Sequence, residues 1–111
     1  MNIQIFGSTK CFDTKKAERY FKERGVRFQS IDLKKFGISR GELQSVMTAC
    51  GGLDALLDPK NDDARALRFF ASADERLARV LDDPSMLRTP IVRNGKQATI
   101  GYVPEIWKGW E

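Results

Sequence analysis

Near its start the chain reads Ile3-Gln4-Ile5-Phe6-Gly7-Ser8-Thr9-Lys10-Cys11-Phe12-Asp13-Thr14-Lys15-Lys16-Ala17. The apolar alternation at the beginning of this stretch predicts a strand over residues 2–6, with Ile3 and Ile5 on one face. A turn of small residues follows, then one cysteine, and then a helical pattern. This order places Cys11 at the junction between a strand and a helix.

A cysteine at the start of a helix is a candidate nucleophile. Free backbone N–H groups and the positive end of the helix dipole favour an anion there, and both lower the pKa of a thiol. Lys10, Lys15 and Lys16 add positive charge nearby, whereas Asp13 opposes the shift. The alternative is that Cys11 is an inert, half-buried small residue.

The first third of the chain predicts a βαβ unit over residues 1–33. A helix is expected over residues 12–24, because apolar positions recur at helical spacing and Gly25 then stops the pattern. A second strand follows, with Val26 and Phe28 on one face, and it ends near Leu33. Two strands joined by one helix with little slack are expected to be parallel.

Residues 39–83 predict a helical block without a strand. A polar turn around Gly37 precedes it, and the sequence Ser39-Arg40-Gly41-Glu42 fits a capping box. The helix that follows carries Cys50 on its apolar stripe, which favours a core role for that thiol over a redox role. Asn61 or Asp62 is expected to cap a second helix, and residues 72–75 form another capping box. The second helix is expected to turn three side chains inward, namely Leu67, Phe69 and Phe70.

The last segment, residues 89–111, predicts a ββα unit. A strand at Pro90-Ile91-Val92 leads to an Asn94-Gly95 hairpin turn and a returning strand over residues 98–100. Pro104 opens a final helix, with Ile106 and Trp110 on one face and Trp107 and Trp110 closing the core. We find no linker or repeat, and therefore expect residues 1–111 to form one domain.

Composition narrows the function classes. The 111 residues are 31% charged and 41% hydrophobic with a net charge of +4, which is ordinary for a soluble protein and too dispersed to indicate direct nucleic-acid binding. Without a membrane span or signal-peptide core, we expect a cytoplasmic protein and no membrane partner. The absence of histidine excludes Cys/His pairs and histidine metal sites, so we expect no metal.

The chain resembles the arsenate-reductase-like ArsC/YffB/Spx family. Five segments match the family pattern. They are the strand and turn that lead to Cys11, Lys15-Lys16-Ala17 with Tyr20-Phe21, Gly52-Leu53-Asp54-Ala55-Leu56-Leu57, Thr89-Pro90-Ile91-Val92 and Ile100-Gly101-Tyr102. The resemblance implies an α/β, thioredoxin-like βαβ–ββα fold with a helical insertion between the halves and a mixed four-stranded sheet. It also implies that Pro90 is a cis-proline facing the nucleophile Cys11.

This chain departs from the family pattern at several positions, and these departures limit which activities of the family we expect it to have. Members that reduce arsenate hold the oxyanion with three arginines, where this chain has Asp58, Thr89 and the segment Gly101-Tyr102-Val103. Arginine is suited to bidentate oxyanion contacts, so their loss argues against arsenate as the substrate. Arg88 is offset by one residue, which on a strand points to the other face.

The resemblance favours the monothiol, YffB-like branch, with Cys11, Thr14 and Lys15 as catalytic residues. Thr14 stands where Spx-like regulators often have a second cysteine, so an external thiol such as glutathione is the expected co-substrate and no cofactor is expected to be bound. Thr89 and Pro90 would align a small thiol or oxidised-thiol substrate.

Three alternatives remain open at this stage. Lys10 and Arg88 would attract a carboxylate or phosphate, or they are simply solubilising surface charges. Gly52 matches the glycine that Spx-like regulators use to contact RNA polymerase, which suggests a protein-binding module, although Gly51-Gly52 also serves as a helix stop. The protein could also be a degenerate member of the family without redox activity.

Overall fold

The computed structural model describes residues 1–70 and 72–110, so Ala71, inside the predicted helical block, and Glu111 lie outside the described residues. One mixed sheet has four strands in the order β2 (Phe28–Asp32), β1 (Ile3–Gly7), β3 (Ile91–Asn94) and β4 (Gln97–Ile100). β1 pairs in parallel with β2 and antiparallel with β3, and β3 pairs antiparallel with β4. This topology confirms the expected βαβ and ββα halves.

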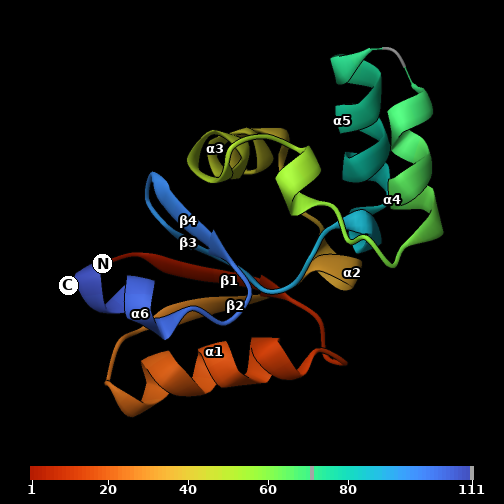
Figure 1. The fold of residues 1–111 in the computed structure, drawn as a ribbon. Coiled ribbons are helices and arrows are strands. Elements are labelled where there is room, and N and C mark those ends of the chain that lie inside the picture. The colour runs from red at the N-terminus through yellow and green to blue at the C-terminus, as the bar shows by residue number, and fades with distance from the viewer. Residues whose placement is uncertain (71, 111) are drawn as a thin grey trace.

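Helices cover both faces of the sheet. In Figure 1, α1 (Phe12–Glu23) and α6 (Pro104–Trp107) lie on one face, and α3 (Arg40–Cys50) lies on the other. The pair α4 (Asp62–Ala66) and α5 (Ala73–Asp82) stands beyond one end of the sheet. No described helix is both long and apolar enough to cross a membrane. The remaining short elements are α2 (Leu33–Phe36), η1 (Asp54–Leu56), η2 (Leu67–Phe69), η3 (Pro84–Met86) and η4 (Lys108–Trp110).

Alternation along the strands divides the core in two. Ile3 and Ile5 of β1 pack with α1 and α6, whereas Phe6 packs with the helical block on the opposite face. In β3, Val92 and Ile91 divide in the same way. Because successive strand side chains point to opposite faces, a five-residue strand can serve both cores. The sheet is therefore buried on both sides, and α1 is held firmly against β1.

Residues 33–36 form helix α2 and not the predicted polar turn. The Asp32 carboxylate caps this helix by accepting a hydrogen bond from the Lys34 N–H at 3.0 Å. Gly37 ends it with a φ of 69°, a conformation that glycine adopts without strain. Buried Leu33 anchors the turn to the core, and this tertiary contact outweighs the polar character of the segment.

The β3–β4 hairpin turn lies one residue later than expected. Asn94 pairs with Gln97, so the two loop residues are Gly95 and Lys96, not Asn94 and Gly95. Gly95 then occupies the first loop position with a φ of 59°, which is the glycine position of a type II′ turn. Both registers put a glycine in the loop, and the pairing of Ile91 with Ile100 decides between them.

In two short helical segments the buried side chains differ from the faces expected from the sequence. Phe69 is 78% exposed and Ile106 is 49% exposed, while Leu67 and Trp107 are buried. Both segments contain a 3-10 turn, at Leu67–Phe69 and at Lys108–Trp110. The 3-10 geometry has three residues per turn, so a pattern extrapolated at 3.6 residues assigns the wrong face.

Candidate active site around Cys11

Cys11 occupies the N-cap position of α1, as the sequence predicts. Its backbone is extended (φ −96°, ψ 116°), and its side chain is half-buried. Its N–H donates to the Ser8 carbonyl at 3.1 Å, and its carbonyl accepts from the Lys15 N–H at 3.4 Å. These two hydrogen bonds fix the turn from β1 into the helix and hold the sulfur at the open end of the helix.

The segment before β3 brings Thr89 and Pro90 to the cysteine. The Thr89–Pro90 peptide bond is cis, as the family resemblance implies. The Cys11 thiol donates a hydrogen bond to the Thr89 carbonyl, with an Sγ–O distance of 3.5 Å across 78 residues of sequence. Pro90 is buried, and its carbonyl accepts from the Gly101 N–H at 2.8 Å. The ββα half thus supplies one wall of the site.

The surroundings of Cys11 favour its thiolate. Burial raises the pKa of this thiol, but hydrogen bonds from the side chains of Thr14 and Thr89 and from the backbone N–H groups of Thr14 and Asp13 lower it by more. The net pKa of Cys11 therefore lies below its ordinary value. The sulfur has two modes of contact, because the thiol donates to the Thr89 carbonyl and the thiolate accepts from these hydroxyl and N–H groups.

Thr14 links the cysteine to the end of β1. Its hydroxyl accepts a hydrogen bond from the Ser8 N–H at 3.3 Å, and its side chain is buried. It fits there because position 7 is glycine: a Cβ on Gly7 would lie 2.3 Å from Thr14 Cγ2 and 2.6 Å from Thr14 Oγ1. The sequence pattern indicates only that Gly7 belongs to a turn of small residues. A glycine at the end of a strand gives no sign that it contacts a residue of the next helix.

The charged residues expected at the site lie outside this group. Lys10, Lys15 and Arg88 are exposed, and none of them is among the groups that lower the pKa of Cys11. Lys15 Nζ lies 5.9 Å from the ring centroid of exposed Phe12. In this geometry hydroxyls and N–H groups approach the sulfur, and the role expected of Lys15 in stabilising the thiolate stays a prediction.

The segment that carries Asp58 runs beside the one that leads to Thr89. An antiparallel bridge joins Leu57 to Leu87, and the Asp58 N–H donates to the Met86 carbonyl at 2.8 Å. The Asp58 carboxylate accepts from the Lys60 N–H at 2.9 Å, so it stabilises its own turn. Like charges repel, so the Asp58 carboxylate disfavours an anionic substrate at this position.

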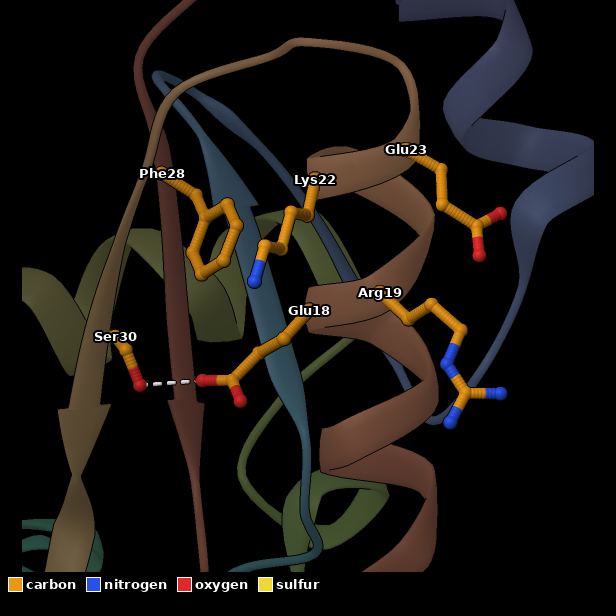
Figure 2. A pocket seen from close by; sticks show the side chains of 6 residues that line it. All are labelled: Glu18, Arg19, Lys22, Glu23, Phe28 and Ser30. Atoms are coloured by element: carbon orange, nitrogen blue, oxygen red, sulfur yellow. Dashed lines mark hydrogen bonds between the residues drawn. The ribbon is translucent and has the colours of Figure 1, made fainter.

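Two cavities follow the groove between α1 and β2. One, of about 360 Å³, adjoins the Cys11 loop and is lined in part by Ser8, Thr14, Lys15 and Asp32. The other, of about 690 Å³, lies further along α1 (Figure 2). Glu18 and Ser30 line both cavities and are hydrogen-bonded to each other, as Figure 2 shows.

Cys50 lies apart from this site. It ends α3 and packs partly buried against the helical-block core, on the face of the sheet opposite α1. Its thiol donates to the Ala98 carbonyl at 3.6 Å, and burial raises its pKa. Both cysteines are free. The geometry of Cys50 is that of an inert core thiol, in line with the sequence-based interpretation.

A cysteine that caps the first helix of a βαβ–ββα sheet, opposite a cis-proline, defines a thioredoxin-like protein. The ArsC family model matches residues 6–109, and the chain belongs to the ArsC family. An arsenate reductase from Vibrio cholerae has the same fold with a TM-score of 0.82 and 23% identity, covering 96% of this chain and 94% of that one.

Two curated relatives match most of the chain. The global transcriptional regulator Spx 2 of Oceanobacillus iheyensis is 24% identical over 92% of this chain and 78% of its own length. The protein YusI of Bacillus subtilis is 22% identical over 92% of both chains. Identities this low leave the activity of the relatives with those proteins. We therefore infer the chemistry of this chain from the residues around its own Cys11.

Proposed function

We propose that this ArsC-family protein is a monothiol oxidoreductase of the YffB-like type that uses Cys11 as its nucleophile and glutathione as its co-substrate. The observation that carries the proposal is the Cys11 sulfur at the start of α1, surrounded by hydrogen-bond donors that lower its pKa. A thiolate, not a thiol, attacks disulfide sulfur.

The reaction has two exchange steps. The Cys11 thiolate attacks the glutathione sulfur of a mixed disulfide, forms a Cys11–glutathione disulfide and releases the substrate as a thiolate. A second glutathione thiolate then attacks the glutathione sulfur of this adduct, which yields oxidised glutathione and restores the Cys11 thiolate. Each step exchanges one S–S bond for another, and the second glutathione supplies the electrons.

The chain's own residues support each step. Thr14 and Thr89 stabilise Cys11 both as the attacking thiolate and as the departing one. Thr14 also occupies the position of a resolving cysteine, and Cys50 is on the other face of the sheet, so the adduct would await an external thiol. The cavity of about 360 Å³ beside Ser8 and Lys15 would receive the peptide part of glutathione.

Arsenate is a poor substrate in this proposal. Asp58 and Thr89 replace two of the arginines expected from the family pattern, and Arg88 is exposed and does not lower the pKa of Cys11. An arsenate dianion would therefore lack bidentate contacts.

The test is steady-state reduction of a glutathionylated peptide, with glutathione and glutathione reductase as the recycling system. The Cys11→Ser variant should lose turnover by on the order of 10³-fold, whereas Cys50→Ser should stay within about twofold of the wild type. Turnover that survives in Cys11→Ser, or that falls equally in Cys50→Ser, would exclude the monothiol mechanism.

A second candidate function is docking on RNA polymerase, which the resemblance of Gly52 to Spx-like regulators implies, and two curated relatives are named global transcriptional regulators. Gly52 supports it, because it is partly exposed after α3 with a φ of 118°. Gly52→Arg should abolish retention of purified polymerase on the immobilised protein. Gly25→Arg is the matched control, since Gly25 also has a positive φ of 68° and open space around its Cα. Equal retention by both variants would count against this function.

A further inference from the structure

A cavity of about 570 Å³ lies between α1 and the segment that opens α6. Arg19 and Glu23 line both this cavity and the one of about 690 Å³ along α1, and Figure 2 shows both side chains directed away from Phe28 and Ser30. The full lining is Lys16, Arg19, Tyr20, Glu23, Arg24, Tyr102, Pro104 and Lys108.

The lining is strongly cationic. Four basic side chains face one carboxylate, Glu23, which leaves an excess of three positive charges. Among residues 1–70 and 72–110 the sole ion pair is Arg65–Asp62, in α4, so none of the cavity's cations is neutralised by a paired carboxylate. Like charges gathered around one hollow repel each other, and an anion would relieve that repulsion.

Tyr20 adds a buried donor to the wall of this cavity. The residue is only 5% exposed, and its hydroxyl has no hydrogen-bond partner among the described residues. Its ring is held by Phe21 and Trp107 at centroid distances of 5.0 and 5.1 Å and by the Arg24 guanidinium at 3.7 Å. A buried hydroxyl without a partner is costly, so an acceptor supplied by a ligand would stabilise it.

Tyr102 gives the cavity an aromatic wall. Its ring is 41% exposed, stands edge-on to Trp107 at 5.6 Å, and has Lys16 Nζ 5.8 Å from its centroid. A ring fixed on one side by a buried tryptophan and open on the other can hold a flat group beside the cations.

We propose that this cavity binds a small anion that carries two or more phosphate groups. Arginine and lysine are suited to phosphate contacts, and the volume falls in the usual range of small-molecule sites. Tyr20 and Arg24 lie nine and thirteen residues after Cys11, or roughly 13 and 20 Å along the helix at 1.5 Å per residue. Lys16 is nearer, about 8 Å along the helix from Cys11, so the cavity begins near the thiol and extends away from it along α1.

Titration calorimetry with inorganic triphosphate and with ATP, without divalent cations, tests the proposal. The double variant Arg19→Ala/Lys108→Ala should bind both anions at least about tenfold more weakly. The control Arg40→Ala/Lys96→Ala removes the same charge from exposed positions outside the cavity and should change affinity by less than about twofold. Equal binding of the two anions would support phosphate recognition alone, and tighter binding of ATP would add stacking on Tyr102.

The Tyr20→Phe variant separates a built site from a merely cationic surface. Its thermal stability without ligand should not fall, because the hydroxyl has no partner to lose, while its affinity for triphosphate should drop several-fold. The Cys11→Ser variant should bind as the wild type does. The proposal fails if neither anion binds, if the Arg19/Lys108 variant matches its control, or if Tyr20→Phe keeps full affinity.

Discussion

Thr14 is the side chain that connects the loop after β1 to the Cys11 sulfur. Its hydroxyl accepts from the Ser8 N–H and donates toward the Cys11 thiolate, so the strand end, the loop and the helix share one hydrogen-bond chain. A hydroxyl held in this orientation stabilises an anion without the entropy cost of ordering a long lysine side chain.

The Thr14→Val variant should raise the pKa of Cys11, because it keeps the shape of the side chain and removes the hydroxyl donor. The pH profile of iodoacetamide alkylation measures this pKa. Lys15→Met serves as the control and should leave the profile in place, since Lys15 is not among the groups that lower the pKa. If Lys15→Met moved the profile further than Thr14→Val, charge would control the thiol and our assignment would be wrong.

Gly7→Ala should destabilise the fold by about 1–3 kcal/mol, the range expected for overpacking, because the added Cβ collides with Thr14. It should also raise the pKa of Cys11, since Thr14 has to move. Gly41→Ala is the matched control: it lies in α3 with open space around it, and should stabilise the protein by about 0.5–1 kcal/mol. Equal effects on stability in urea unfolding would refute the close approach of Gly7 and Thr14.

The N-terminus of α3 illustrates how one element connects to the sheet. Ser39 and Glu42 form the capping box that the sequence predicts, and the Glu42 carboxylate also accepts from the Gln4 amide of β1 at 3.3 Å. Burial raises the pKa of Glu42, but hydrogen bonds from the Ser39 backbone and side chain and from Gln4, together with the charge of Arg93, lower it overall.

This lowered pKa predicts a pH-dependent contribution of Glu42 to stability. The folded-state pKa is below the unfolded one, so the contribution is fully present above the unfolded value and is lost as the pH falls through the folded value. In urea unfolding between about pH 6 and pH 3, the wild type should lose more stability than Glu42→Gln, which keeps the cap without titrating. Parallel losses in the two proteins would contradict the shift.

A buried hydrogen bond fastens helix α6 to the sheet, from Trp107 Nε1–H to the Thr99 hydroxyl of β4 at 2.8 Å. Thr99→Val should cost about 1–3 kcal/mol, because it leaves the indole N–H buried without a partner. The exposed Thr48→Val serves as the control and should change unfolding by no more than about 0.5 kcal/mol. A Thr99→Val cost as small as that of the control would mean that packing alone holds α6.

Local signals account for the elements that the sequence predicts correctly. The alternation of β1, the Ser39–Glu42 capping box and Pro104 at the start of α6 each depend on neighbours within a few residues. The errors arise where tertiary packing chooses between local options. Leu33 draws residues 33–36 into a helix, and the pairing of Ile91 with Ile100 moves the hairpin turn to Gly95-Lys96.

Across the whole molecule, the candidate site is predictable only in part. The position of Cys11 follows from its own segment, and the expectation of a cis-proline at position 90 came from the family resemblance. The hydrogen bond from Cys11 to Thr89 joins residues 78 positions apart, and the approach of Gly7 to Thr14 depends on how α1 packs on β1. Neither contact leaves a trace in the local sequence pattern, which therefore points to lysines as the stabilisers of the thiolate.

The most direct test is the thiolate pKa of Cys11 in a Cys50→Ser background, followed by mass spectrometry after exposure to oxidised glutathione. Serine keeps a donor for the Ala98 carbonyl, so the background should fold normally. We predict a pKa below the ordinary value of a cysteine and a single glutathione adduct on Cys11. A thiol that titrates near the unperturbed value of about 8.5 and forms no adduct would contradict the proposed chemistry.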